Sequence, residues 1–176
     1  MTQYNLRELM GFVPQKAVLF SGTIRDNMQY GKPDATDEMI WKALEIAQAK
    51  DFVSEMEDGL DSHVEQGGGN FSGGQRQRLA IARALVKTAD IYVFDDSFSA
   101  LDFKTDANLR QALKTNMKES ITVLVAQRVS TVMDADMILV LDEGKLVGKG
   151  THEELLATNE TYQEIVHSQL REEDLA

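Results

Sequence analysis

An apolar run of four residues that ends at two adjacent carboxylates constrains this chain more than any other feature. Residues 91–94 read IYVF, and Asp95 and Asp96 follow directly. A short, continuous apolar run predicts a strand buried in a sheet, so the two acids emerge at its carboxyl end. Because side chains alternate across a strand, the two carboxylates point in different directions and are not expected to share one role.

Further apolar runs and helical patterns follow one another along the chain. Residues 10–15 and 121–127 read as strands, the second one buried, and residues 136–150 as two strands that turn at Glu143 and Gly144. Helices are predicted over residues 36–56, 75–86, 103–117 and 151–170, with Asp102 as an N-cap and with Thr151 and Glu154 as a capping box. Apolar strands separated by helices predict an α/β fold with a largely parallel sheet covered on both faces.

A glycine-rich segment, FSGGQRQR at residues 71–78, leads into the helix predicted from residue 75. A serine and two glycines at a helix start offer a hydroxyl and uncovered N–H groups to an anion, in the field of the helix dipole. An ordinary turn in which Ser72 caps the helix explains the same residues, so the segment alone leaves both interpretations open.

Composition excludes several classes of protein. The formal net charge of −11 argues against a nucleic-acid surface, which would be basic. The chain has no cysteine, which excludes a disulfide framework and a thiolate metal site. No uninterrupted apolar stretch approaches the length of a bilayer crossing, so a membrane role is expected only through a partner or a further segment.

The order of the motifs resembles the ATP-binding domain of ATP-binding-cassette (ABC) transporters. Gln15 is followed by FSGGQRQRLAIARAL, then by IYVFDD, SALD and VLVAQR, and the resemblance covers nearly the whole chain. It implies a P-loop NTPase-like α/β core in residues 1–29 and 89–150, lacking the first strands of that fold. Residues 30–88 would form an inserted helical subdomain with the SGGQ loop, and residues 151–176 the C-terminal helices.

The resemblance also implies roles at an ATP and Mg²⁺ site. Asp95 would hold the Mg²⁺, with Gln15 as a second oxygen ligand; a helix cap or a solvated strand end is the alternative for Asp95. Asp96 stands where the family usually has a glutamate that polarises water, and its carboxylate is set back by roughly 1.5 Å. Gln127 stands where the family has a histidine, and an amide cannot carry a positive charge.

These two departures resemble the degenerate half of a heterodimeric exporter. In that group each ATP lies between one subunit's own motifs and the SGGQ loop of a second subunit arranged head to tail. That loop is matched here by Ser72, Gly73, Gly74 and Gln75, and the loop that couples the two sites by residues 99–102, which include Asp102.

Two further segments favour an exporter. Residues 18–31, VLFSGTIRDNMQYG, resemble the stretch after the glutamine loop of exporters, and Glu65 lies where exporters contact their membrane domain. A solvated acidic loop is the alternative for Glu65. The resemblance implies transmembrane domains upstream and a location at the cytoplasmic face of the cell membrane.

The 176 residues contain no G-x-x-x-x-G-K-[ST], the loop that cradles phosphates. In the family this loop precedes the glutamine, so we expect the domain to begin before Met1, and we expect these residues alone to bind ATP poorly and not to hydrolyse it. A chromosome-maintenance ATPase is disfavoured, because only 72 − 15 = 57 positions separate Gln15 from Ser72 and no coiled coil intervenes. A translation-factor cassette and a truncated interaction module remain open.

Overall fold

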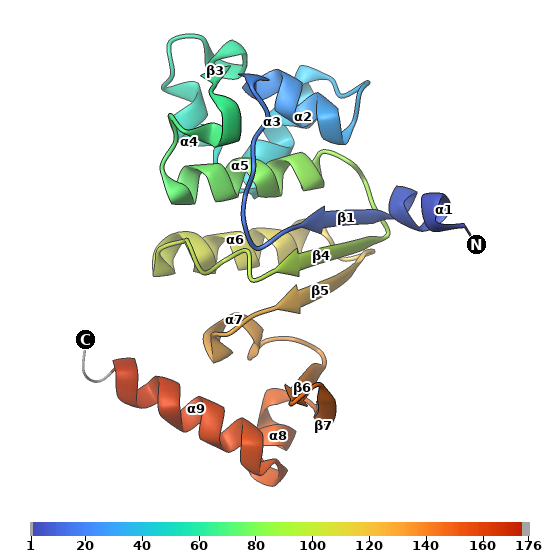
Figure 1. The fold of residues 1–176 in the computed structure, drawn as a ribbon, viewed down its shortest axis with the longest axis vertical. Helices are drawn as coiled ribbons and strands as arrows, with labels where there is room; N and C mark the ends of the chain where they lie inside the picture. Colours follow the sequence, from blue (N-terminus) through green and yellow to red (C-terminus); the bar gives the residue numbers. More distant parts are fainter. Residues whose placement is uncertain (1, 174–176) are drawn as a thin grey trace. The chain divides into compact units, whose positions relative to one another are not determined.

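The computed structural model describes residues 2–173, which belong to two compact units (Figure 1). The first unit is Met1–Val125 and the second is Ala126–Ala176. This division differs from the boundaries expected at residues 29/30, 88/89 and 150/151, and the subdomain assignment therefore stays a prediction.

The first unit contains a parallel sheet and most of the helices. Its elements are α1 (Gln3–Glu8), β1 (Met10–Val13), β2 (Gly22–Thr23), α2 (Ile24–Gly31), α3 (Asp37–Ile46), α4 (Lys50–Ser54), η1 (Gly59–Asp61), β3 (His63–Val64), η2 (Gln66–Gly68), α5 (Gly73–Leu85), β4 (Ile91–Asp95), α6 (Phe103–Asn116) and β5 (Ile121–Val125). Strands β1, β4 and β5 pair in parallel in that spatial order, while β2 and β3 pair antiparallel. The predicted α/β class is confirmed, as are the strands at β1, β4 and β5.

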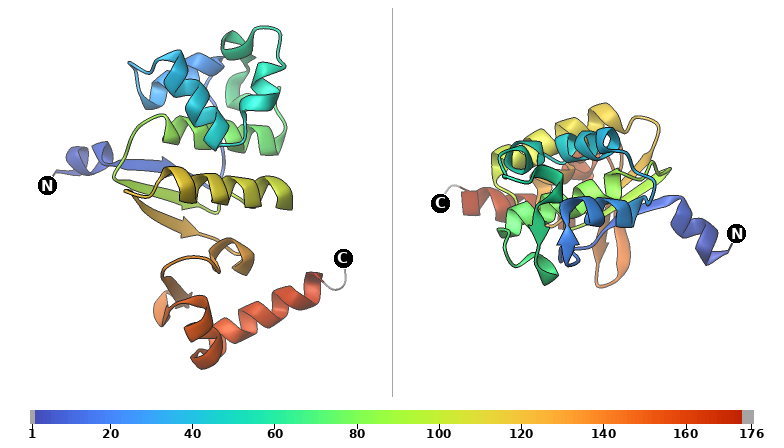
Figure 2. Two further views of the ribbon diagram at one scale, coloured as in Figure 1. Left: turned by 180° about the vertical axis from the view of Figure 1, so that it is seen from behind. Right: turned by 90° about the horizontal axis from the view of Figure 1, so that it is seen from above.

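Helices α5 and α6 cover one face of the parallel sheet, and α6 lies in front of the strands when the molecule is seen from behind (Figure 2, left). Tyr92 and Phe94 of β4 are 5% and 0% exposed and belong to the same core as Leu109 and Leu113 of α6. On the neighbouring strand, a Cβ added to Gly11 would lie 3.2 Å from the carbonyl oxygen of Ala84, so α5 packs closely there. Alternate residues of each strand therefore form the core of the first unit.

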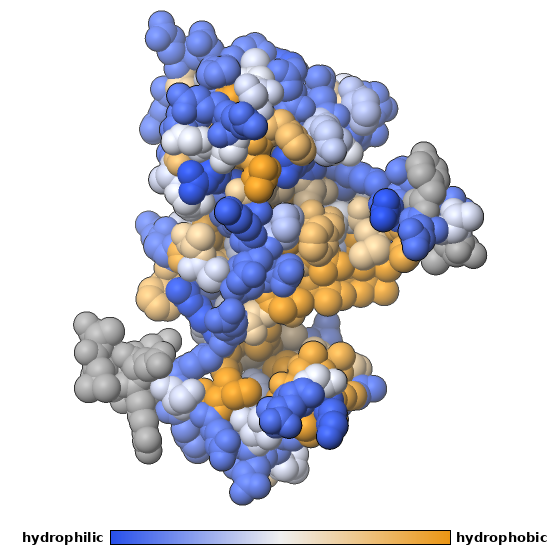
Figure 3. Space-filling view, viewed as in Figure 1, coloured by the Kyte–Doolittle hydropathy of each residue, from blue (hydrophilic) through white to orange (hydrophobic). Residues whose placement is uncertain are grey.

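The expectation that both faces are covered is wrong for the described residues. The side chains that alternate onto the other face remain exposed: Phe12 by 56%, Ile121 by 64%, Val123 by 44% and Val125 by 52%. Figure 3 shows hydrophobic residues gathered along the strands on this side. The physical reason is that α5 and α6 both pack on the opposite face of the three-stranded sheet. The prediction that residues 121–127 are buried is wrong for the same reason.

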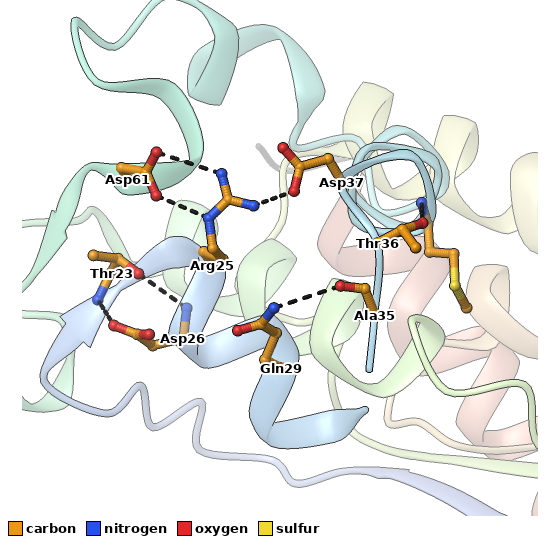
Figure 4. Close-up of polar contacts among 9 residues, drawn as sticks. Thr23, Arg25, Asp26, Gln29, Ala35, Thr36, Asp37 and Asp61 are labelled. Carbon is orange, nitrogen blue, oxygen red and sulfur yellow. Dashed lines mark hydrogen bonds and ion pairs between the residues drawn. The ribbon is translucent and has the colours of Figure 1, made fainter. Parts of the chain in front are cut away.

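A single arginine ties three helical segments of the first unit together (Figure 4). The Arg25 guanidinium in α2 pairs with Asp37 at the start of α3, and its Nε donates to Asp61 Oδ1 in η1 over 2.8 Å. Thr23 and Asp26 form a capping box that begins α2. The sequence interpretation assigned no helix to these residues.

Acidification is expected to weaken this junction. The side-chain hydrogen bond from Arg25 holds the pKa of Asp61 below its usual value. A carboxyl group with a depressed folded pKa adds stability above its unfolded pKa of about 3.9, and this stability is lost as the pH falls through the folded pKa. Urea unfolding midpoints should therefore fall further between about pH 5 and pH 3 for the natural sequence than for Asp61→Asn. Parallel falls in the two proteins would contradict this expectation.

The second unit is a hairpin packed on helices. Its elements are α7 (Val129–Val132), β6 (Ile138–Asp142), β7 (Lys145–Gly150), α8 (His152–Thr158) and α9 (Glu160–Glu173). Glu143 and Gly144 turn the hairpin with φ angles of 45° and 75°, and Thr151 and Glu154 form a capping box, both as predicted. The core consists of Ile138, Val140, Leu155, Tyr162 and Val166. Among residues 2–173, no helix combines the length and the apolar character that a bilayer crossing requires.

Candidate functional site

Gln15 and Asp96, which lie 81 positions apart, meet at the carboxyl edge of the parallel sheet. Gln15 Nε2 donates a hydrogen bond to Asp96 Oδ2 over 3.2 Å. The contact forms because Val13 at the end of β1 lies opposite Phe94 near the end of β4, so the residues that follow both strands emerge side by side. This edge is where ligands bind in open α/β sheets.

The backbone around Asp96 fixes the direction of its carboxylate. Asp96 has a φ of +43°, a left-handed conformation that aspartate tolerates better than most residues. Its N–H donates to Val125 O over 2.8 Å, and Ser99 Oγ donates to its carbonyl oxygen over 2.9 Å. A left-handed residue held from both sides at a sheet edge is a feature common at functional sites.

Asp95 is the last residue of β4 and lies opposite Val125 of β5. Within the part of the chain that the structure describes, its half-buried carboxylate has no hydrogen-bond or ion-pair partner. The described residues hold no cluster of three acidic or histidine side chains suited to a metal. Asp95, Asp96 and the Gln15 amide nevertheless supply the oxygen donors that fit Mg²⁺, which binds one or two carboxylates together with phosphates and water.

Ser97 is a site residue that the sequence interpretation missed. It is 1% exposed, and its Oγ lies 3.0 Å from Val13 O and 3.2 Å from Asp95 O, in position to donate to either carbonyl. The hydroxyl thus joins the ends of β1 and β4, which carry Gln15 and the two aspartates. The only sequence signal for Ser97 is a hydroxyl two positions after the end of β4.

Replacing Ser97 with alanine is expected to lower the free energy of unfolding by about 1–2 kcal/mol, because the buried Val13 carbonyl loses a donor. Urea denaturation measures this change. The matched control is Ser54→Ala, which also removes a hydroxyl that donates to a main-chain carbonyl, that of Asp51, but at an exposed position. The control should change stability by less than about 0.5 kcal/mol, and equal losses would contradict the role given to Ser97.

The serine turn at residues 72–75 begins α5. Ser72 Oγ accepts from the Gln75 N–H over 3.2 Å, and the Ser72 N–H donates to Gln75 Oε1 over 3.0 Å, which completes a capping box. The interpretation of Ser72 as a helix cap is therefore confirmed. Ser72 and Gly73 are exposed, so the positive end of the helix also faces outward, and an anion-binding role stays a prediction.

The loop of residues 99–102 lies beside this turn. A Cβ added to Gly74 would lie 3.4 Å from the carbonyl oxygen of Ala100. Asp102 caps α6 as predicted, since it accepts from the N–H and from the Oγ1 of Thr105 over 2.9 and 2.7 Å. These bonds, the side-chain bond foremost, lower the pKa of Asp102. Its expected contribution to nucleotide binding stays a prediction.

The structure places Gln127 and Glu65 at exposed positions. Gln127 lies in the second unit, is exposed, and its carbonyl accepts from Gln169 Nε2 of α9. Glu65 is exposed in the first unit, and its N–H donates to Asn70 Oδ1 over 3.0 Å. The phosphate role of Gln127 and the membrane-domain contact of Glu65 stay predictions.

Comparisons with known proteins identify the family. Residues 2–99 match the family model described as ABC transporter. An uncharacterized ABC transporter ATP-binding protein of Mycobacterium tuberculosis is 52% identical over 163 residues, which are 91% of this chain and 28% of that protein. A multidrug resistance ABC transporter ATP-binding and permease protein of Lactococcus lactis is 42% identical over 94% of this chain and 28% of its own length.

A solved structure leads to the same family. A bacterial Atm1-family ABC exporter with ATP bound matches with a TM-score of 0.93 and 39% identity, over 97% of this chain and 30% of that one. The chain thus spans less than a third of the length of the relatives it matches. It belongs to the ABC transporter family, and its similarity is to the ATP-binding domain of exporters.

Proposed function

We propose that the chain is part of the ATP-binding module of an exporter, working with transmembrane domains and a second, non-identical nucleotide-binding domain. The observation that carries the proposal is the Gln15 to Asp96 contact at the sheet edge, in the same unit as an exposed, capped serine turn. The fused ATP-binding and permease relative of Lactococcus lactis supports the transmembrane partner. The module would work at the cytoplasmic face of the cell membrane.

At its own site, the chain supplies ligands and a weak base. Asp95 and Gln15 would hold a Mg²⁺, and this cation would neutralise negative charge on the phosphates of ATP. Asp95, whose carboxylate is half-buried and without a partner among the described residues, is the principal metal ligand, and the Gln15 amide oxygen is the second. Asp96 orients the attacking water poorly, because its shorter side chain is directed toward Gln15. Gln127 hydrogen-bonds the terminal phosphate without providing a positive charge.

At the partner's site, the chain supplies an anion clamp. The Ser72 hydroxyl accepts from Gln75, which leaves its own proton to donate to a phosphate oxygen of the partner's ATP. The exposed N–H of Gly73 adds a second donor, in the positive field of α5. The loop of residues 99–102 packs beside Gly74, so it connects the two sites across a head-to-tail interface.

The polypeptide of residues 1–176 alone is proposed to bind ATP weakly and not to hydrolyse it. Its sequence contains two carboxylates at the sheet edge but no phosphate-cradling G-x-x-x-x-G-K-[ST] loop. Titration calorimetry with ATP and Mg²⁺ checks this proposal. Tight, Mg²⁺-dependent binding by this polypeptide would contradict it.

The asymmetry of the two sites is tested by ATP hydrolysis in the assembled transporter. Ser72→Ala removes a donor at the competent site and is expected to lower the rate by about 10–100-fold. Asp96→Asn alters a site that already turns over slowly and should lower the rate by less than about twofold. Equal losses from the two substitutions would contradict a degenerate own site.

A further inference from the structure

Arg78, two positions after Arg76 in α5, connects the serine turn to a distant part of the first unit. Its Nε donates to Gly74 O over 3.3 Å, and its Nη1 donates to Gln48 O over 2.6 Å. Its guanidinium lies 4.9 Å from the ring centroid of Phe52. One planar side chain thus fixes two carbonyls, 26 positions apart in the chain, and stacks on an aromatic ring.

The carbonyl that Arg78 binds belongs to a rigid helix end. Gln48 has a φ of +59°, its N–H donates to Glu45 O over 3.0 Å, and the Ala49 N–H donates to Leu44 O over 2.7 Å. These two bonds define the Schellman motif that ends α3, with glutamine at a position where glycine is usual. The Gln48 carbonyl is therefore held in a fixed direction by the backbone.

The contact with Phe52 extends to the residue directly before the turn. Phe52 packs edge to face on Phe71 with ring centroids 6.4 Å apart, and Phe71 is 6% exposed. Ser72 follows Phe71 in the chain. The turn is therefore held on two sides: the packed Phe71 ring directly precedes Ser72, and Arg78 bonds to Gly74.

The neighbouring loop acts on the same arginine. Burial lowers the pKa of the Arg78 guanidinium, and the charges of Asp102 and Asp51 oppose this shift. Asp102 ends the loop whose Ala100 carbonyl lies beside Gly74. The Asp102 carboxylate thus interacts electrostatically with Arg78, which is also bonded to the serine turn.

We propose that Arg78 is a positioning residue: it holds the turn of residues 72–75 in a fixed direction by joining Gly74 to the end of α3 at Gln48. The role given to the turn rests on the proposed function, but the positioning does not depend on nucleotide. A displacement of α3 would then be transmitted to the donors of Ser72 and Gly73. Arg78 itself does not contact the phosphate.

The test is amide hydrogen exchange, measured by NMR on the chain of residues 1–176 without nucleotide. Two N–H groups report on the turn: that of Gln75, bonded to Ser72 Oγ, and that of Arg76, bonded to Ser72 O. In Arg78→Gln both should exchange about tenfold faster, while the Ile81 N–H further along α5 changes little. Because the exchange experiment contains no ATP, a negative result would contradict the positioning role of Arg78 without affecting the proposed function. A negative result in the hydrolysis test would likewise leave the positioning role unaffected.

Matched variants separate positioning from general stability. Arg25→Gln removes two ion pairs elsewhere in the first unit and should leave the exchange of Gln75 relative to Ile81 unchanged. Arg78→Lys keeps the charge but lacks the planar fork, so it should restore only part of the protection. If Arg78→Gln does not fold, Phe52→Leu, which removes the stacked ring, should accelerate exchange at the turn about threefold. Unchanged exchange at the turn, or an equal acceleration along all of α5, would overturn the proposal.

Discussion

Replacing Phe94 with alanine is expected to lower the free energy of unfolding by about 3–5 kcal/mol. Phe94 lies in β4, the central strand of the parallel sheet, and is 0% exposed. Its ring stacks on Phe98 at 5.5 Å and lies 6.4 Å from that of Tyr92. Truncation would leave a cavity between the sheet and the helices that cover it, and the stacked rings would lose their partner.

Phe12→Ala is the matched control for this change. Phe12 lies in β1 of the same sheet, but on the uncovered face, where it is 56% exposed. Its truncation should cost less than about 1 kcal/mol, because little apolar surface returns to water and no cavity forms. Equilibrium denaturation in urea measures both variants. Similar losses for Phe94 and Phe12 would show that the sheet does not have one buried and one exposed face.

Replacing Ser72 with aspartate is expected to lower ATP hydrolysis by the assembled transporter by about 100-fold or more without destabilising the chain. Aspartate caps a helix as well as serine does, so the hydrogen bond to the Gln75 N–H and the start of α5 should survive. On the proposed function, a carboxylate at this position would remove the hydroxyl donor and repel the terminal phosphate of the partner's ATP.

The control for this substitution is Thr151→Asp. Thr151 is likewise an N-cap in a capping box, at the start of α8 in the second unit. Its replacement should leave the free energy of unfolding nearly unchanged and the rate of ATP hydrolysis within about twofold of that of the natural sequence. If Ser72→Asp hydrolyses ATP at the natural rate, the turn has no contact with phosphate. If it loses hydrolysis only in proportion to thermal stability, the effect is structural.

The sequence allows the placement of those features that depend on local chemistry. The apolar run of residues 91–94 predicts β4, and the Glu143–Gly144 pair between two apolar runs, with a glycine that readily adopts a left-handed conformation, predicts the turn of the hairpin. Asp102 and Ser72 are both recognisable as N-caps from the sequence, because capping is a local interaction. Each side chain accepts a hydrogen bond from the N–H three residues later. Motif order predicts that Gln15 and the two aspartates belong to one site, and the structure adds a hydrogen bond between Gln15 and Asp96 that was not predicted.

Features that depend on tertiary arrangement were not predictable in the same way. An apolar strand pattern does not reveal which helices cover which face, so the exposure of Ile121 and Val125 was not foreseen. Ser97 carries no motif, since its importance comes from the Val13 carbonyl 84 positions away. Helix α2 could have been found from its capping box at Thr23 and Asp26.

The central claim is that the serine turn of this chain contacts ATP held by a second nucleotide-binding domain, and cross-linking tests it most directly. Because the chain has no cysteine, Ser72→Cys introduces a single thiol. In the assembled transporter, this thiol should cross-link to a cysteine placed in the phosphate-binding loop of the second domain when ATP is present, and far less without it. Thr115→Cys, at an exposed position near the end of α6, should not cross-link under either condition. A Ser72→Cys yield that is independent of ATP, or no greater than that of Thr115→Cys, would contradict the account.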